Sequence, residues 1–131
     1  MNSPAIDIKD MLVAESSLGL IYATNLFVQK EPISPIEVVT IYDTFGYSPQ
    51  LTLDKAQYEY PAVQIRVRSK HQDVGYQLAY AIMTALHGRS HETWNETLYT
   101  LIRCSSGPAL LDWDENGRVH FIINFLVQRR S

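Results

Sequence analysis

The sequence contains little that would support secretion, disulfide bonding or membrane insertion. Its 131 residues include one cysteine, Cys104, so no disulfide can form within the chain. No apolar run approaches the roughly 20 residues that span a bilayer. The N-terminus lacks the basic segment and continuous apolar run of a secretion signal. We therefore expect a protein without a membrane segment that is assembled in a reducing cytoplasm.

Motifs for catalysis and for phosphate binding are also missing from the sequence. The six glycines are scattered singly, which excludes a glycine-rich phosphate loop. Ser105 and Ser106 do not form a nucleophile elbow, and Cys104 has no neighbouring histidine. His87 and His91 have the spacing of metal ligands, but a glycine between them ends the preceding helix pattern. The sequence therefore predicts no catalytic residue, no metal ligand and no cofactor, and we expect a protein that is not an enzyme.

Positive charge is scarce over the whole chain. The formal net charge is −3, whereas domains that bind nucleic acid through overall charge are strongly basic. Hydrophobic residues make up 46% and charged residues 19%, a globular composition. The length fits one domain, residues 1–131. A small nucleic-acid-binding module is a less favoured alternative.

The acidic segment "DWDENG" resembles the start of an EF-hand calcium loop. Asp112, Asp114 and Asn116 supply oxygens at alternate positions, and Gly117 follows at the sixth. The twelfth position requires a bidentate glutamate but holds Ile123, and the following residues have a strand pattern. A polar hairpin turn with Asn-Gly at its apex explains the same residues. A small calcium-binding module is therefore a second, less favoured alternative.

The pattern of apolar residues predicts two helices and several strands. Helices are expected at about residues 4–18 and 71–87, the second ending before Gly88. Its predicted core stripe consists of Val74, Leu78, Ile82 and Leu86, and a neighbouring apolar stripe consists of Tyr76, Tyr80 and Met83. Strands are expected at residues 25–29, 38–44, 62–68, 96–106 and 118–128, with 109–113 paired to the last. These elements predict an α+β fold, a mainly antiparallel, mixed sheet packed against two helices.

Residues 45–61, between two predicted strands, are expected to form a long loop because they contain a glycine and two prolines. Loops of this length in compact domains are usually functional or disordered, and the apolar residues in this one favour function. We expect these apolar residues to make contacts at an interface: Phe45, Tyr47, Leu51, Tyr58 and Tyr60.

The last two predicted strands are apolar on both sides. Leu98 and Ile102 are expected opposite Tyr99 and Leu101 in the alternation of a strand. Two small helices cover only part of one face of a sheet, so the loop or another subunit must bury the remaining apolar surface. The sequence therefore predicts an oligomer.

The stretch "YPAVQIRVRSK" alternates apolar and cationic residues. Val63, Ile65 and Val67 alternate with polar positions, and the cations are Arg66, Arg68 and Lys70. A solvated strand face explains this pattern. The functional interpretation is a set of polar anchors that bind carboxylates of a neighbouring copy. Asp43, Asp54 and Glu59 are candidates for those carboxylates.

The order of several segments resembles the tail terminator and minor capsid proteins of long-tailed bacteriophages. The segments are "IYDTFGYSPQL", "YEYPAVQIRVRSK", a helix ending "ALHG", and "LIRCSSGPALLDWDENGRVHFIINFLV". The similarity extends from about residue 27 to 127 and contains no catalytic signature.

The resemblance implies a small α/β fold that forms a hexameric ring at the head-proximal end of the tail. There such proteins stop growth of the tail tube and offer a surface to head-completion proteins. A stopper or minor capsid protein of the head–tail connector is the nearest alternative. Six copies at a formal charge of −3 would carry −18, which would let DNA pass through the lumen without binding.

Overall fold

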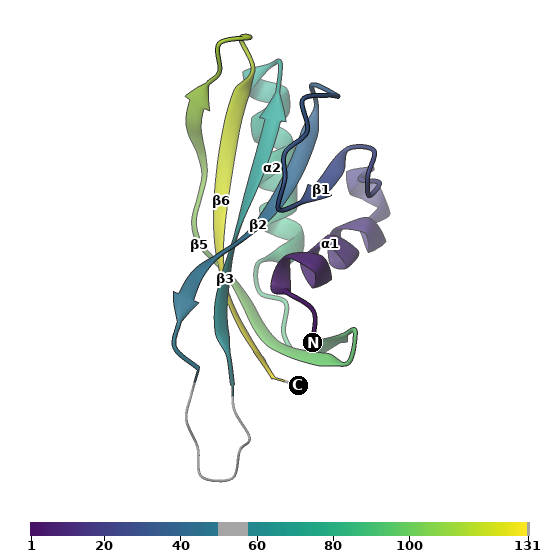
Figure 1. Ribbon diagram of the computed structural model, residues 1–131, viewed down its shortest axis with the longest axis vertical. Coiled ribbons are helices and arrows are strands. Elements are labelled where there is room, and N and C mark those ends of the chain that lie inside the picture. The colour runs from purple at the N-terminus through teal and green to yellow at the C-terminus, as the bar shows by residue number, and fades with distance from the viewer. Residues whose placement is uncertain (50–57, 131) are drawn as a thin grey trace.

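The structure, a computed structural model, describes residues 1–49 and 58–130 (Figure 1). Helix α1 spans Pro4–Ala14, the 3-10 turn η1 spans Ser16–Leu18, and helix α2 spans Gln72–Leu86. The strands are β1 (Leu26–Val28), β2 (Val38–Tyr47), β3 (Tyr60–Ser69), β4 (Glu92–Trp94), β5 (Thr97–Trp113) and β6 (Val119–Arg130). Neither helix in these residues is both long and apolar enough to cross a membrane.

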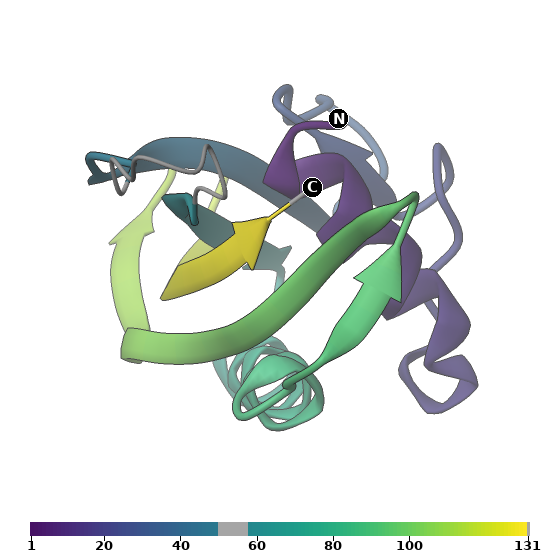
Figure 2. The ribbon, with the colours of Figure 1, turned by 90° about the horizontal axis from the view of Figure 1, so that it is seen from below.

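The strands form one sheet in the order β1-β2-β3-β6-β5-β4. Strand β1 pairs with β2 in parallel, and the other neighbouring strands pair antiparallel. Seen from below, the sheet is curled, with β5 sweeping around β6 (Figure 2). The predicted α+β fold with a mainly antiparallel, mixed sheet and two helices is confirmed.

Both helices contribute to one hydrophobic core with the same face of the sheet. The side chains that meet there include Ile8, Met11, Leu12, Ile82, Leu86, Val63, Ile65, Val67, Ile123 and Phe125. Helix α2 lies close to β6 because Gly75 has no side chain. A Cβ atom at Gly75 would lie 3.1 Å from the Phe121 ring. A larger residue there would require the Phe121 ring or the helix to shift by a few tenths of an ångström.

The predicted core stripe of α2 is partly wrong. Val74 is 52% exposed, and Gly75 and Ala79 are buried in addition to Ile82 and Leu86. The core-facing side of the helix is therefore centred on small residues that allow close approach, rather than on the spacing of large apolar residues. The neighbouring Tyr76 is exposed and packs edge-on against the Phe121 ring at a centroid distance of 5.9 Å.

The two predicted segments 96–106 and 109–113 form one long strand, β5. Irregularities in its register with β6 keep the strand paired through the Gly107-Pro108 sequence. Gly107 has a φ of +96°, and a Cβ atom there would lie 2.5 Å from the carbonyl oxygen of Ile122. Only glycine fits this bulge. The turn at Asn116-Gly117 joins β5 to β6, as predicted.

A second irregularity in the register between β5 and β6 changes which residues of β5 face the core. Tyr99 pairs with Arg129 and Leu101 with Gln128, so one extra residue lies between them on β5. Tyr99 and Ile102 are consequently both buried in the core instead of lying on opposite faces. The prediction that they oppose each other was wrong because strict alternation ends at a bulge.

The predicted loop 45–61 is also shorter than expected. Strand β2 continues through Tyr47 and β3 begins at Tyr60. Phe45, Tyr47 and Tyr60 therefore belong to strands. Leu51 lies outside the described residues. We call residues 44–47 and 60–62 the arm; they lie at the lower end of β2 and β3 in Figure 1.

Candidate functional site

The sheet has an outer face that points away from the helices. Because alternate side chains of a strand lie on opposite faces, the core position of Ile65 places Gln64 and Arg66 on the outer face. Neighbouring strands continue this face in cross-strand rows. Two such rows are Tyr42, Gln64, Asn124 and Ser106, and Thr40, Arg66, Ile122 and Ala109. The outer face is therefore mainly polar at its centre.

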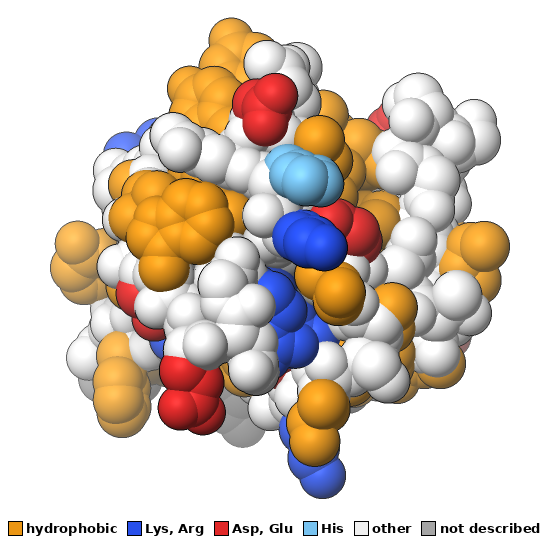
Figure 3. All heavy atoms as spheres, turned by 90° about the horizontal axis from the view of Figure 1, so that it is seen from above, with side chains coloured by type: hydrophobic (Ala, Val, Ile, Leu, Met, Phe, Trp, Pro, Cys, Tyr) orange, Lys and Arg blue, Asp and Glu red, His pale blue; other side chains and the backbone are white. Residues whose placement is uncertain are grey.

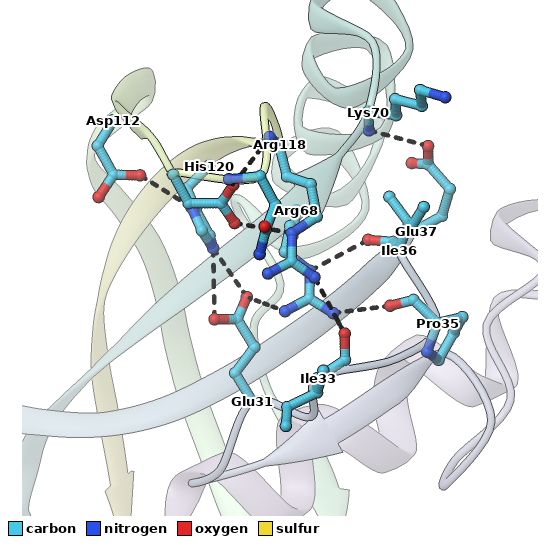
Figure 4. Close-up of polar contacts among 12 residues, drawn as sticks. Glu31, Ile33, Pro35, Ile36, Glu37, Arg68, Lys70, Asp112, Arg118 and His120 are labelled. Atoms are coloured by element: carbon cyan, nitrogen blue, oxygen red, sulfur yellow. Dashed lines mark hydrogen bonds and ion pairs between the residues drawn. The ribbon is translucent and has the colours of Figure 1, made fainter.

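Arg68, which lies on the same side of β3 as Arg66, is buried, with an exposed fraction of 3%. Its guanidinium donates hydrogen bonds to the carbonyl oxygens of Ile36 at 3.1 Å, Ile33 at 3.2 Å and Pro35 at 2.7 Å. It also lies 3.7 Å from a carboxylate oxygen of Glu31 (Figure 4). Burial lowers the pKa of Arg68, and Glu31 opposes that effect. Arg68 thus holds residues 31–36 against the sheet, so the cationic face expected to be open is covered at this position.

Glu31 is also bound by His120 of β6. The Nε2 atom of His120 lies 3.1 Å from Glu31 Oε1, and its Nδ1 atom lies 2.8 Å from Asp112 Oδ1. Arg118 donates to the carbonyl oxygen of Ile33 at 3.0 Å. Together these side chains form what we call the Glu31 cluster: Glu31, Arg68, Asp112, Arg118 and His120. Seen from above, the surface of the molecule carries acidic, basic and histidine side chains among hydrophobic ones (Figure 3).

Sequence reasoning missed the Glu31 cluster. Glu31 is separated from Arg68 by 37 positions and from His120 by 89, and no spacing rule connects them. The residues meet because the segment after β1 crosses the ends of β3 and β6 (Figure 4). The cations Arg68 and Arg118 were visible in the sequence, but their acceptors are mostly backbone carbonyls.

Arg66 and Lys70 are more accessible than Arg68. Arg66 is half-buried, donates to Gln64 Oε1 at 2.9 Å and lies 5.2 Å from the centroid of the Tyr42 ring. Lys70 is exposed, and its backbone N–H donates to a Glu37 carboxylate oxygen at 3.1 Å. These two cations can reach a partner without unfolding the segment over the sheet. Their role at an interface stays a prediction.

The arm presents aromatic side chains to solvent. Phe45 is fully exposed and Tyr47 is 71% exposed. A bulge lies between Thr44 and Tyr47, where Phe45 and Gly46 face the single residue Pro61. A Cβ atom at Gly46 would lie 2.0 Å from the carbonyl oxygen of Tyr60. The missing side chain at Gly46 therefore allows the two strands to stay in contact while Phe45 projects outward.

The far side of the arm is tied to the C-terminal end of β6. Glu59 and Arg129 exchange two backbone hydrogen bonds, of 2.8 and 3.0 Å, and their side chains form an ion pair at 3.2 Å. The guanidinium of Arg130 lies 5.8 Å from the Tyr58 ring centroid. Tyr60 pairs with Tyr47 across the arm. Glu59 therefore makes these contacts within its own chain. Asp43 also has a partner within the chain, because its carboxylate accepts a hydrogen bond from the Ala5 N–H at 3.0 Å.

An open pocket of about 150 Å³ lies where the arm meets the outer face. Tyr47 and Tyr60 line it from the arm, and Leu101 and Arg103 line it from β5. The remaining lining residues are Leu126, Val127 and Gln128 of β6. Two of the predicted interface residues are therefore brought together here with side chains that the sequence did not single out. The pocket forms because β6 lies between β3 and β5 in the sheet, although β3 is far from both in the sequence. A local sequence pattern does not reveal this pairing.

The acidic turn and the cysteine have structural contacts of their own. Asp114 accepts hydrogen bonds from the backbone N–H groups of Asn116 and Arg118, each at 2.9 Å, and from the Arg118 guanidinium at 2.7 Å. These bonds lower the pKa of Asp114.

The Cys104 N–H donates to His87 at 2.9 Å, and burial raises the pKa of the Cys104 thiol. Among the described residues, no group of three or more potential ligands is arranged to hold a metal ion.

Comparison with known proteins identifies a matching family and solved structures with a similar fold. The sequence model of a family described as "Bacteriophage tail terminator protein" matches residues 6–130. A solved structure described as "Virion of native gene transfer agent (GTA) particle" contains a chain with a similar fold, with a TM-score of 0.71 and 10% sequence identity. The similarity covers 98% of this chain and 96% of that chain. Among curated proteins, no sequence matches.

Proposed function

This chain belongs to the bacteriophage tail terminator family, and from that premise we propose that it forms a hexameric ring at the head-proximal end of the tail tube. Membership makes it a structural protein of the virion tail. In the proposed role the ring stops polymerisation of the tube protein and offers a surface to the head-completion protein. The ring acts by binding partner surfaces of complementary shape and charge, and it catalyses no reaction.

The exposed aromatic arm is the observation that best supports a contact between copies. Large aromatic side chains are enriched at the centres of protein interfaces, and full exposure of Phe45 costs free energy in an isolated monomer. A head-to-tail contact between different surfaces of identical subunits closes into a ring when the rotation permits. In this proposal the arm provides one of those surfaces, through Phe45, Tyr47 and Tyr60. Tyr58, which precedes the arm residue Tyr60, and Leu51, which lies outside the described residues, are proposed as further contacts.

The accessible cations provide polar anchors for the same assembly. Arg66 and Lys70 lie near the surface, where they can bind carboxylates of an adjacent subunit or of a tail protein. Arg68 contributes indirectly, by fixing the segment that carries Glu31 and Glu37. Replacing both Arg66 and Lys70 by glutamate is expected to weaken ring formation without the unfolding that a charge reversal at buried Arg68 would cause.

Deletion of the gene from its parent phage or prophage tests the proposed function. Electron microscopy is expected to show overlong tails without heads, because nothing ends tube growth. Complementation with the wild-type gene should restore normal length. Complementation with the Arg66→Glu, Lys70→Glu variant should restore it poorly.

Two other outcomes of the deletion contradict the proposal. Tails of normal length that fail to join filled heads would assign the chain to another connector role, such as a stopper or minor capsid protein. Normal infectious particles would exclude a role in either step.

A further inference from the structure

We propose that Phe45 of one copy inserts into the pocket between the arm and the outer face of the next copy. The inference rests on the proposed ring and names the contact that would hold neighbouring subunits together. Three observations carry it: how Phe45 is presented, what size the pocket has, and where both features lie.

Phe45 is presented as a rigid knob. It sits in the bulge between Thr44 and Tyr47 and is fully exposed. Gly46 beside it lies against the Tyr60 backbone so closely that a Cβ atom would be 2.0 Å from the carbonyl oxygen. Strand pairing on both sides of the bulge limits the motion of Phe45. Its insertion would therefore cost less conformational entropy than that of an aromatic residue on an unpaired loop.

The pocket has the volume that one aromatic ring requires. It measures about 150 Å³, and an apolar protein cavity of roughly 150 Å³ is large enough to bind benzene. Leu101, Leu126 and Tyr47 supply apolar surface, while Arg103 and Gln128 supply polar groups around it. An Arg side chain beside a bound phenyl ring can add a cation–π contact. The chain's own Phe45 does not fill this pocket, because its side chain is fully exposed.

Knob and pocket lie beside each other, since Tyr47 lines the pocket two residues after Phe45. Each copy therefore offers both an exposed phenyl ring and a pocket that could receive one. When every Phe45 around the ring enters the pocket of the following subunit, the arm takes part in both halves of the contact, and closure leaves no Phe45 exposed and no pocket empty. A second copy is thus the occupant that satisfies both features at once. The tail tube protein would satisfy only one of them.

Photocrosslinking in assembled tails tests the contact. The probe is p-azidophenylalanine at position 45, incorporated into the terminator of otherwise normal particles. Irradiation is expected to join position 45 of one copy to peptides of another copy that contain residues 101–103 or 126–128. The same probe at Tyr80, an exposed position on α2, is the matched control and should give no crosslink to those peptides. Crosslinking of position 45 to the tube protein would overturn the inference.

Substitution gives an independent readout. Phe45→Ala is expected to weaken association between subunits by at least about tenfold, as removal of a central aromatic anchor does. Its unfolding midpoint should stay unchanged, since Phe45 is exposed in the monomer. Tyr80→Ala should leave assembly unchanged.

The outcomes separate this inference from the proposed function. Rings of Phe45→Ala that form with wild-type affinity would overturn the contact and leave the terminator role intact. Tails that carry no ring in the wild type would overturn both.

Discussion

Arg68 shows how the surroundings of one residue differ from what its strand pattern suggests. The alternation of β3 places it beside Arg66, yet three backbone carbonyls and Glu31 surround its guanidinium. A buried cation is stable only when it is paired and hydrogen-bonded. Loss of Arg68 would remove this donor from the carbonyl oxygens of Ile36 and Pro35, whereas Glu31 keeps its contact with His120.

Arg68→Ala is expected to lower the free energy of unfolding by roughly 2 kcal/mol or more, because each buried carbonyl that loses its donor costs about 1–3 kcal/mol. Arg66→Ala is the matched control on the same strand. It should cost about 1 kcal/mol or less, because Arg66 is half-exposed and stabilised by a cation–π contact and one hydrogen bond. Urea denaturation of both variants measures the difference. Equal losses would show that the contacts over Arg68 contribute little.

A second buried polar group links α1 to the sheet. The Tyr99 hydroxyl donates to Asp7, and Arg129 donates to the same hydroxyl at 3.2 Å. Burial is the largest cause that raises the pKa of Tyr99, and the hydrogen bond to Asp7 raises it further. The folded protein therefore retains the Tyr99 proton at a pH where an exposed tyrosine has lost it.

The stability of the protein is expected to fall as the pH rises above 10, the ordinary pKa of tyrosine. Below that pH both states hold the proton, so the stabilisation is complete. Above it the unfolded chain releases the proton first, and the free energy of unfolding decreases with pH. Denaturation across pH 8 to 12 should show a shallower decline for Tyr99→Phe. A decline of unchanged steepness in Tyr99→Phe would exclude Tyr99 as its source.

At the scale of elements, bulges determine which residues of β5 face the core. The extra residue between Tyr99 and Leu101 brings Tyr99 and Ile102 to the same side. Further along, Gly107 lets the strand follow β6 where a side chain would collide with the Ile122 backbone. The curl of the sheet in Figure 2 therefore depends on a few irregular positions.

Gly107→Ala is expected to destabilise the protein by roughly 3 kcal/mol or more, because it combines a strained positive φ with a backbone collision. Gly88→Ala is the control, since Gly88 also has a positive φ of +88° but nothing within 4 Å of an added Cβ atom. It should cost about 1 kcal/mol. Thermal denaturation of the two variants tests the ranking. Equal midpoints would mean that β5 shifts to accommodate the side chain.

At the scale of the whole molecule, the negative net charge is expected to keep DNA from binding as it passes through the proposed ring. A ring of six copies, as proposed, would carry −18, and like charge disfavours nonspecific binding of the DNA backbone. The cations Arg68 and Arg118 of the Glu31 cluster are already bonded within the subunit. They are therefore poor candidates for phosphate contacts.

Purified rings are expected not to retain double-stranded DNA, even at low salt. Electrophoretic mobility of a DNA fragment should remain unchanged at about 50 mM salt, where electrostatic binding is strongest. A shift that appears there and disappears at about 200 mM would reveal a basic lumen surface and contradict the prediction.

The sequence by itself determined the fold class, both helices, every strand except the short β4, and the hairpin turn at Asn116-Gly117. These features depend on local periodicity and on residues with special backbone preferences, which are properties of short segments. The aromatic residues around Phe45 were also recognisable as candidates for contacts. Their placement on strands was hidden because a bulge with glycine resembles a loop in sequence.

Tertiary structure alone decided the register of β5, the burial of Arg68 and the position of the pocket. Each depends on residues far apart in the chain, such as Glu31 with His120 or Tyr47 with Leu126. Such pairs form when the strand order β1-β2-β3-β6-β5-β4 brings distant segments together. Local propensity does not encode that order, because it results from packing both helices on one face of a curled sheet.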